Sequence, residues 1–139
     1  MISFSYQVLV GADNLDDKKN KRWLKDVISR EGKKTGDIQY VFCDDNYLAA
    51  INKSFLNHDT FTDIITFPTT DNPDLISGEI YISMERVNEN SKKNSVSFSE
   101  ELSRVILHGI LHLIGYKDYS DSEKKLIRGK EDYYLHLQR

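Results

Sequence analysis

Short runs in which apolar and polar side chains alternate are interspersed along this chain with longer runs in which apolar residues recur every three or four positions. In the opening segment, apolar residues alternate with serines and a glutamine until Gly11. A two-residue period predicts a strand with one buried face, because successive side chains of a strand point to opposite sides. Pro68 closes a later run of this kind. The strands predicted in this way cover residues 2–10, 37–44, 62–68 and 78–83.

Helical spacing of apolar residues and capping side chains predict about five helices around these strands. They are one capped by Asp13 or Asn14 and stopped by Gly32, one capped by Asp44, one from Met84 to about Asn94, one capped by Ser99, and one that starts at a Ser120–Glu123 capping box and runs to about Leu137. About four strands and about five packed helices predict an α+β fold with a mixed sheet. At 139 residues we expect a single domain, 1–139.

The composition limits the class of protein. With 39% hydrophobic and 29% charged residues it is typical of a globular domain. Cys43 is the one cysteine, so no internal disulfide can form, which fits a reducing compartment. We see neither a signal segment nor an apolar run long enough to span a membrane, and we expect a cytoplasmic protein. The net charge of −3 means that any nucleic-acid contact must come from a local basic patch.

The segment VILHGILHLIGYKD, which ends at Asp118, places two histidines in an otherwise apolar helical run. One helical turn is 3.6 residues, so His108 and His112 project from the same face. Gly115 allows a sharp turn, and Asp118 follows far enough behind it to return to the pair. Zinc accepts imidazole and carboxylate ligands, and a catalytic zinc has three protein ligands with a fourth position for water. We therefore expect a metal site at the end of a central helix.

This H-x-x-x-H-x-x-G-x-x-D pattern has the spacing of the extended zinc motif of metzincin proteases, with aspartate in the last position. Those proteases carry a glutamate directly after the first histidine as general base. Gly109 occupies that position here, which argues against peptidase chemistry while metal-activated water stays open. The alternatives are that both histidines are core residues, that Asp118 only caps the last helix, or that Asp121 is the third ligand instead.

Three blocks, INKSFLNHDTFTDIITFP, SGEIYIS and HGILHLIGYKD, follow one another between roughly positions 40 and 120. They resemble the signatures L-N-x-x-[YF]-R-x-x-D-x-P-T-D-V-L-S-F-P, G-D-I-x-I-S and H-G-x-L-H-L-x-G-Y-D-H of the YbeY family of bacterial metal-dependent endoribonucleases. The matching residues are Asn52, Phe55, Asp59, Thr62, Asp63, Phe67, Pro68, Gly78, Ile80, Ile82, Ser83, His108, Gly109, Leu111, His112, Leu113, Gly115 and Tyr116. The resemblance implies a mixed sheet covered by helices, with the metal helix at one mouth of a cleft.

The chain departs from the family pattern at Asp118, Lys117, Leu56 and Phe61, among other positions. The third metal histidine of the family falls at Asp118, and carboxylate oxygen is also a zinc ligand, so we expect the site to survive with a lower net charge. Lys117 takes the place of the aspartate in the same signature. The arginine of the first block, thought to meet RNA phosphate, falls at Leu56. Phe61 replaces a proline, which we expect to adjust a loop only.

Phosphate contacts must then come from other side chains, because leucine cannot bind an anion. The candidates nearest to the motif blocks are His58, Arg86 and Lys117. Lys124 and Arg128 of the expected last helix lie close in sequence to the metal ligands and are further candidates. Thr62 and Asp63 are interpreted as structural residues at a strand start.

The resemblance implies a single-strand-specific, zinc-dependent endoribonuclease that acts in small-subunit ribosomal RNA maturation and ribosome quality control. One zinc per chain would be held by His108, His112 and Asp118, which act through the metal-bound water. The implied partners are a ribosomal RNA precursor and the ribosome or its small subunit, with no membrane. Whether water or the RNA 2′-hydroxyl is the nucleophile stays open. Two other functions also stay open: a metallopeptidase-like hydrolase and a non-catalytic, ribosome-associated metal-binding factor.

Overall fold

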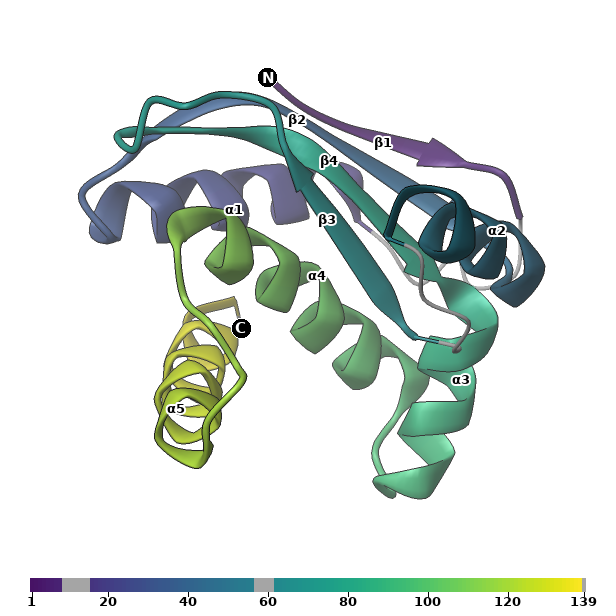
Figure 1. The fold of residues 1–139 in the computed structure, drawn as a ribbon. Coiled ribbons are helices and arrows are strands. Elements are labelled where there is room, and N and C mark those ends of the chain that lie inside the picture. The colour runs from purple at the N-terminus through teal and green to yellow at the C-terminus, as the bar shows by residue number, and fades with distance from the viewer. Residues whose placement is uncertain (9–15, 57–61, 139) are drawn as a thin grey trace.

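In its described residues, the computed structural model has a four-stranded mixed sheet and five helices, as the sequence predicts (Figure 1). The structure describes residues 1–8, 16–56 and 62–138, and the side chains of residues 54–56 lie outside this description. The elements are β1 (Ile2–Tyr6), α1 (Asp17–Arg30), β2 (Lys34–Cys43), α2 (Asp45–Leu56), β3 (Ile64–Pro68), β4 (Leu75–Ser83), α3 (Met84–Lys93), α4 (Phe98–Ile114) and α5 (Asp121–Gln138). Within the described residues, no helix is both long and apolar enough to cross a membrane.

The strands are ordered β1-β2-β4-β3 across the sheet. β2 pairs in parallel with both β1 and β4, whereas β3 runs antiparallel to β4. β1 and β3 are therefore the two edge strands, and β3 has one side that does not pair within the sheet (Figure 1). The short loop of residues 69–74 reverses the chain between β3 and β4, as its polar composition predicts.

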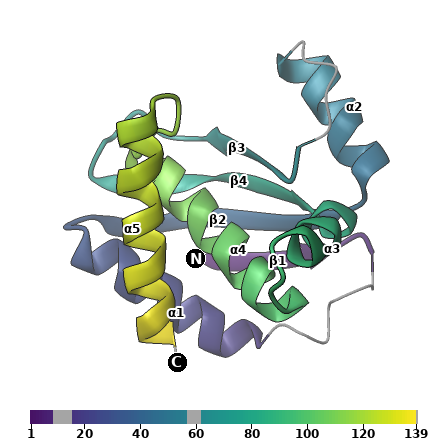
Figure 2. The same ribbon diagram turned by 90° about the horizontal axis from the view of Figure 1, so that it is seen from below.

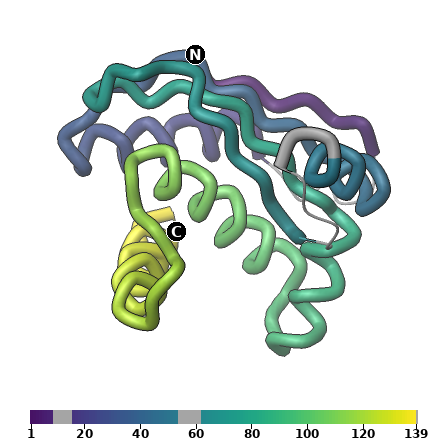
Figure 3. Tube along the Cα trace, in the orientation of Figure 1, coloured from purple at the N-terminus to yellow at the C-terminus, as the bar shows by residue number. Residues whose placement is uncertain are grey.

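The main hydrophobic core lies on the face of the sheet that α1, α3 and α4 cover (Figure 2). Buried residues of α5 extend this core behind α4. α4 packs directly on the sheet, and α5 crosses α4 on the side away from it (Figure 3). A smaller cluster of Cys43, Leu48 and Ile65 lies on the opposite face, where α2 packs. The period-two alternation of the strands thus separates two cores, and the helix that carries both histidines is in the larger one.

Two helix starts differ from those expected. α1 is capped by Asp16, whose carboxylate accepts from the Lys19 N–H, and the expected caps at Asp13 and Asn14 lie outside the described residues. α4 is capped by Ser97 rather than Ser99, because the Ser97 hydroxyl accepts the Glu100 N–H at 3.1 Å. The caps at Asp44 and at Ser120 with Glu123 are confirmed, the latter with hydrogen bonds in both directions.

Candidate metal centre

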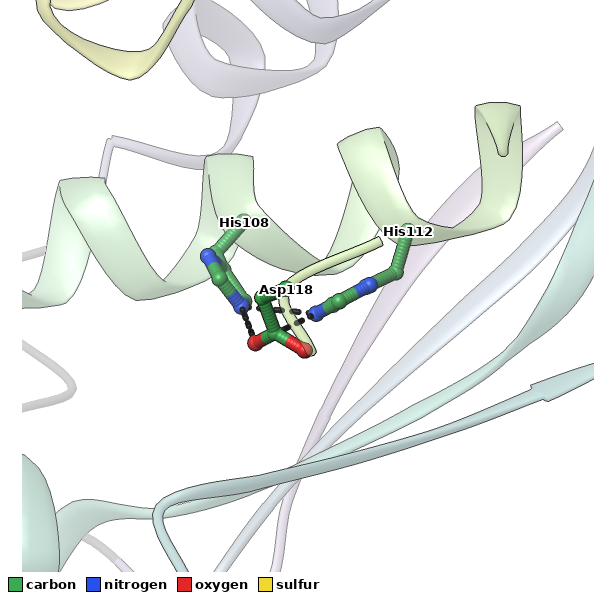
Figure 4. A group of neighbouring side chains, drawn as sticks. All are labelled: His108, His112 and Asp118. Atoms are coloured by element: carbon green, nitrogen blue, oxygen red, sulfur yellow. Dashed lines mark hydrogen bonds and ion pairs between the residues drawn. The ribbon is translucent and has the colours of Figure 1, made fainter. Parts of the chain in front are cut away.

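The two histidines lie in the last two turns of α4, which ends at Gly115 with a φ of 127°. Residues that carry a side chain rarely adopt this φ, so a glycine at position 115 lets the chain leave the helix sharply. The Gly115 N–H closes the helix on the carbonyls of His112 and Leu111. The following residues then bring Asp118 back alongside the histidine face, as the spacing of the motif predicts (Figure 4).

His108, His112 and Asp118 bring three ligand atoms within 4.8 Å of one another. The two Nε2 atoms are 2.7 Å apart, and the Asp118 Oδ2 lies 3.5 Å from His108 Nε2 and 3.4 Å from His112 Nε2. The side chains are partly exposed, with Asp118 at 39%. The cluster therefore faces solvent from the end of the helix, and all three side chains point to one place (Figure 4).

These distances fit a zinc ion. Ligands about 2.0–2.1 Å from a tetrahedral zinc lie about 3.3 Å from one another. The two distances from Asp118 Oδ2, 3.5 and 3.4 Å, already have that value, and the two imidazole rings need to separate by only a fraction of an ångström from 2.7 Å. The residues that could hold the ion are thus two imidazoles and one carboxylate.

Both imidazoles are oriented through their Nδ1 atoms. His108 Nδ1 lies 2.5 Å from Glu131 Oε2, and His112 Nδ1 lies 2.9 Å from the Tyr116 carbonyl oxygen. Because each acceptor takes an Nδ1–H, the lone pair of each Nε2 is directed at the shared point. Such outer contacts are typical of metal-binding histidines, and Glu131 is a residue of the candidate site that the sequence pattern does not predict.

Glu131 comes from α5 and is 3% exposed. Its Oε1 accepts from Arg104 at 2.9 Å, and the same guanidinium donates to Asp132 at 2.7 Å. Burial of His108 opposes its protonation, but the hydrogen bond and charge of Glu131, with the charges of Asp118 and Asp63, raise the pKa of the imidazole. The consecutive helices α4 and α5 are therefore joined by a charged network directly beside the ligand cluster.

A pocket of about 420 Å³ opens in front of the cluster. Its opposite wall is formed by β3 and the residues before it, 62–66, with Asn52 of α2 and Tyr119 at the sides. Asp63 lies in this wall, and burial raises its pKa against the opposing charge of His108. Thr62 and Asp63, expected to be structural at the strand start, thus also line the pocket.

The unpaired side of β3 faces this pocket. The Asp63 carbonyl accepts from the Ser83 N–H and the Ser77 carbonyl accepts from the Thr69 N–H, so odd-numbered residues direct their backbone groups to β4. In an antiparallel pair such residues alternate with residues whose backbone groups point away from the partner strand. Ile64 and Thr66 therefore direct their backbone groups to the free edge, and both line the pocket.

The family model described as endoribonuclease YbeY matches residues 8–138 of this chain. The chain belongs to the YbeY family of endoribonucleases. A protein named endoribonuclease YbeY from Flavobacterium johnsoniae is 52% identical over 132 residues, which cover 95% of this chain and 93% of the relative. Another of that name from Flavobacterium psychrophilum is 49% identical over 137 residues, 99% of this chain and 96% of the relative. The solution structure of TM1509 from Thermotoga maritima has a TM-score of 0.70 at 29% identity and is matched over 99% of this chain and 89% of its own.

The YbeY signature residue Gly109 has a packing reason in this structure. A Cβ at position 109 would lie 2.9 Å from Ile80 Cγ2 and 3.0 Å from Ile64 Cδ1. α4 therefore lies so close to β3 and β4 that only glycine fits without movement. The glutamate that follows the first histidine in metzincins therefore has no room at position 109, which disfavours peptidase chemistry.

The residues of this YbeY member that are predicted to contact phosphate lie in different parts of the chain. His58 is outside the described residues. Arg86 forms an ion pair with Asp45 at 2.8 Å, at the start of α3. Lys117, Lys124 and Arg128 are exposed, and none of the three lines the pocket.

Proposed function

We propose that this protein is a zinc-dependent endoribonuclease that hydrolyses single-stranded RNA. The observation that carries the proposal is the cluster of His108, His112 and Asp118, whose ligand atoms face a pocket in a chain of the YbeY family. The matched relatives are named endoribonucleases, which supports a phosphodiester as the bond that is cut. One zinc per chain is the ion that we assign to the two imidazoles and the carboxylate.

Bound at this cluster, zinc supplies Lewis-acid chemistry, either by polarising a phosphoryl oxygen or by activating a nucleophile. Glu131 holds the Nδ1 proton of His108, and the Tyr116 carbonyl holds that of His112, so both rings keep one tautomer throughout. Asp63 is the second carboxylate among the described residues of the pocket wall, and we assign to its oxygen the proton released by the nucleophile. The backbone groups of Ile64 and Thr66 orient the RNA along the free edge.

The number of ligands supports catalysis over a structural metal. A structural zinc usually has four protein ligands, whereas the cluster found among the described residues has three. A fourth position on a bound ion would then be open to solvent or substrate. This supports the proposed nuclease over a non-catalytic, ribosome-associated factor.

The substrate that we propose is a ribosomal RNA precursor of the small subunit, with roles in its maturation and in ribosome quality control in the cytoplasm. RNA and the ribosome or its small subunit are then the partners. His58, Arg86, Lys117, Lys124 and Arg128 are the candidate phosphate contacts, and their basic side chains would supply locally what a net charge of −3 does not.

The test combines metal analysis with cleavage of a ribosomal RNA fragment that has single-stranded segments. We expect the wild-type protein to hold about one zinc per chain and to cut the RNA, and His112→Ala to lose both. His136→Ala is the matched control, because His136 is an exposed histidine on α5 that is not part of the cluster. Retention of cleavage by His112→Ala, or a wild-type protein that binds zinc but leaves RNA intact, would contradict the proposal.

A further inference from the structure

A second hollow lies beside the metal pocket, between α2 and the β3–β4 hairpin. This base groove, as we name it, has a volume of about 500 Å³ and is lined mainly by apolar side chains. Its lining includes Tyr47 and Ile51 of α2, Phe67 and Pro68 of β3, and Glu79 and Tyr81 of β4. The groove is on the face of the sheet where the small cluster around Cys43 lies, opposite the main core.

Three aromatic rings of the base groove pack against one another. Phe67 meets Tyr81 edge-on, with ring centroids 5.9 Å apart and an interplanar angle of 82°. Tyr47 lies over Tyr81 at 6.4 Å with an angle of 29°, and it is 40% exposed. A centroid distance of 6.4 Å places the Tyr47 and Tyr81 rings at the loose end of the stacking range. A flat apolar ligand can therefore stack on the exposed face of Tyr47 without disturbing the core.

The base groove also holds one hydrogen-bonding group with a defined direction. The Tyr81 hydroxyl donates to Glu79 Oε1 at 2.9 Å, which orients this carboxylate in the lining of the groove. A carboxylate accepts about four hydrogen bonds, so Glu79 can also accept an amino group from a ligand. Among flat ligands, a nucleobase with an exocyclic amino group meets both requirements, because a carboxylate pairs with the cytosine N4 amino group in this way.

The base groove and the metal pocket share the same two elements. On α2, Asn52 lines the metal pocket, while the preceding Ile51 lines the groove. On β3, residues 64–66 line the pocket, and residues 67–68 line the groove together with Thr69 directly after the strand. α2 lies beside β3 in the fold (Figure 1). At about 3.3 Å per strand residue, the two hollows are separated by only about 10 Å along β3. A single strand that crosses the free edge of β3 reaches both.

We propose that the base groove binds an unpaired, amino-bearing base of the RNA whose phosphodiester lies at the metal cluster. The inference rests on the proposed function and deepens it, because it names a base-recognition site for the same substrate. Stacking on aromatic side chains recognises single-stranded nucleic acid without demanding one sequence, and Glu79 adds a preference for cytosine, adenine or guanine over uracil. A base in a duplex cannot enter, so the groove also explains selection of single strands.

The test uses short RNA oligomers that carry the fluorescent base 2-aminopurine at successive positions. Binding is measured on the full-length His112→Ala background, so that the readout does not depend on cleavage. We expect quenching at one position, and Tyr47→Ala to remove that quenching and to weaken binding about tenfold, as stacked bases typically require. Tyr133→Ala is the matched control, because Tyr133 is a tyrosine of similar exposure, 54%, on α5.

Equal binding by the Tyr47→Ala and Tyr133→Ala proteins, with quenching retained, would overturn the proposed base groove. If the wild-type protein still cuts RNA, the proposed function is not affected by that result. Conversely, quenching that depends on Tyr47 in a protein that never cuts RNA would support the groove and refute the nuclease. Absence of quenching at every labelled position of the RNA would overturn the proposed base groove directly. A second variant, Glu79→Gln, is expected to keep stacking but to reduce the preference for cytosine over uracil about tenfold, which a purely structural role for Glu79 would not produce.

Discussion

Replacement of Glu131 by glutamine should disturb the orientation of His108, the proposed zinc ligand, while α5 stays packed on α4. Both donors that meet this carboxylate, the His108 Nδ1–H and the Arg104 guanidinium, require an acceptor. A glutamine amide offers one acceptor oxygen and one NH₂ group, so one of the two donors must face another donor. Because the site is 3% exposed, water cannot easily repair the mismatch.

The expected loss follows from what such outer contacts contribute to metal sites. Removing one typically lowers metal affinity 10- to 100-fold, and a 30-fold loss corresponds to about 2 kcal/mol. At saturating zinc, the same amount is lost from the stabilisation that zinc gives to the folded protein. For a domain of 139 residues this lowers the zinc-induced rise in Tm by about 6 °C.

Zinc affinity is measured by competition with a chelator, and Tm is recorded with and without zinc for each variant. Asp132→Asn is the matched control, because Asp132 binds the same Arg104 guanidinium at 2.7 Å but lies outside the bonds to His108. Asp132 is 60% exposed, so its loss should change zinc affinity by less than twofold. An equal loss of affinity in both variants would refute the orientation argument, since it would place the effect in Arg104 rather than in His108.

Three further outcomes are expected. Asp118→His replaces an anionic ligand by a neutral one, so cleavage should extend to lower pH in a pH–rate profile, because a more positive metal site lowers the pKa of its water. Gly109→Ala should lower the free energy of unfolding by about 1–3 kcal/mol in urea titrations, since its Cβ would lie 2.9 Å from Ile80. Glu31 is half-buried, and burial alone would raise its pKa, but hydrogen bonds from Tyr116, Tyr134 and Lys130 lower that pKa below the ordinary 4.5. Its stabilisation is therefore present above pH 4.5 and is lost as pH falls through the lower folded pKa, a loss that urea titrations of Glu31→Gln should not show.

The elements were predictable from periodicity, but their ends and order were less so. Ser97 and Glu100 have the spacing of a capping box, so the sequence contains a signal for an N-cap at Ser97 rather than at Ser99. β2 begins at Lys34, before the expected start at residue 37, because its first residues pair with the beginning of β4. The strand order depends on how the connections cross the sheet, and local patterns contain no record of this.

The cluster of His108, His112 and Asp118 was predictable because its residues lie within one helix and the turn that follows it. Glu131 was not, since it reaches His108 from another helix. A signal for it exists: the buried face of α5 is otherwise apolar, with Ile127, Tyr134 and Leu135, and a carboxylate on such a face needs a partner. The part played by residues 62–66 in the pocket depends on β3 being an edge strand, which only the three-dimensional arrangement reveals.

The joining of α4 to α5 through Glu131 also sets a sequence of events during protein synthesis. A growing chain emerges from its N-terminus, so the sheet and both histidines exist before α5 has been made. Until α5 packs on α4, His108 lacks the carboxylate that fixes its tautomer, whereas His112 already has the Tyr116 carbonyl. The proposed metal site therefore reaches its full affinity only after α5 has been made and has packed on α4.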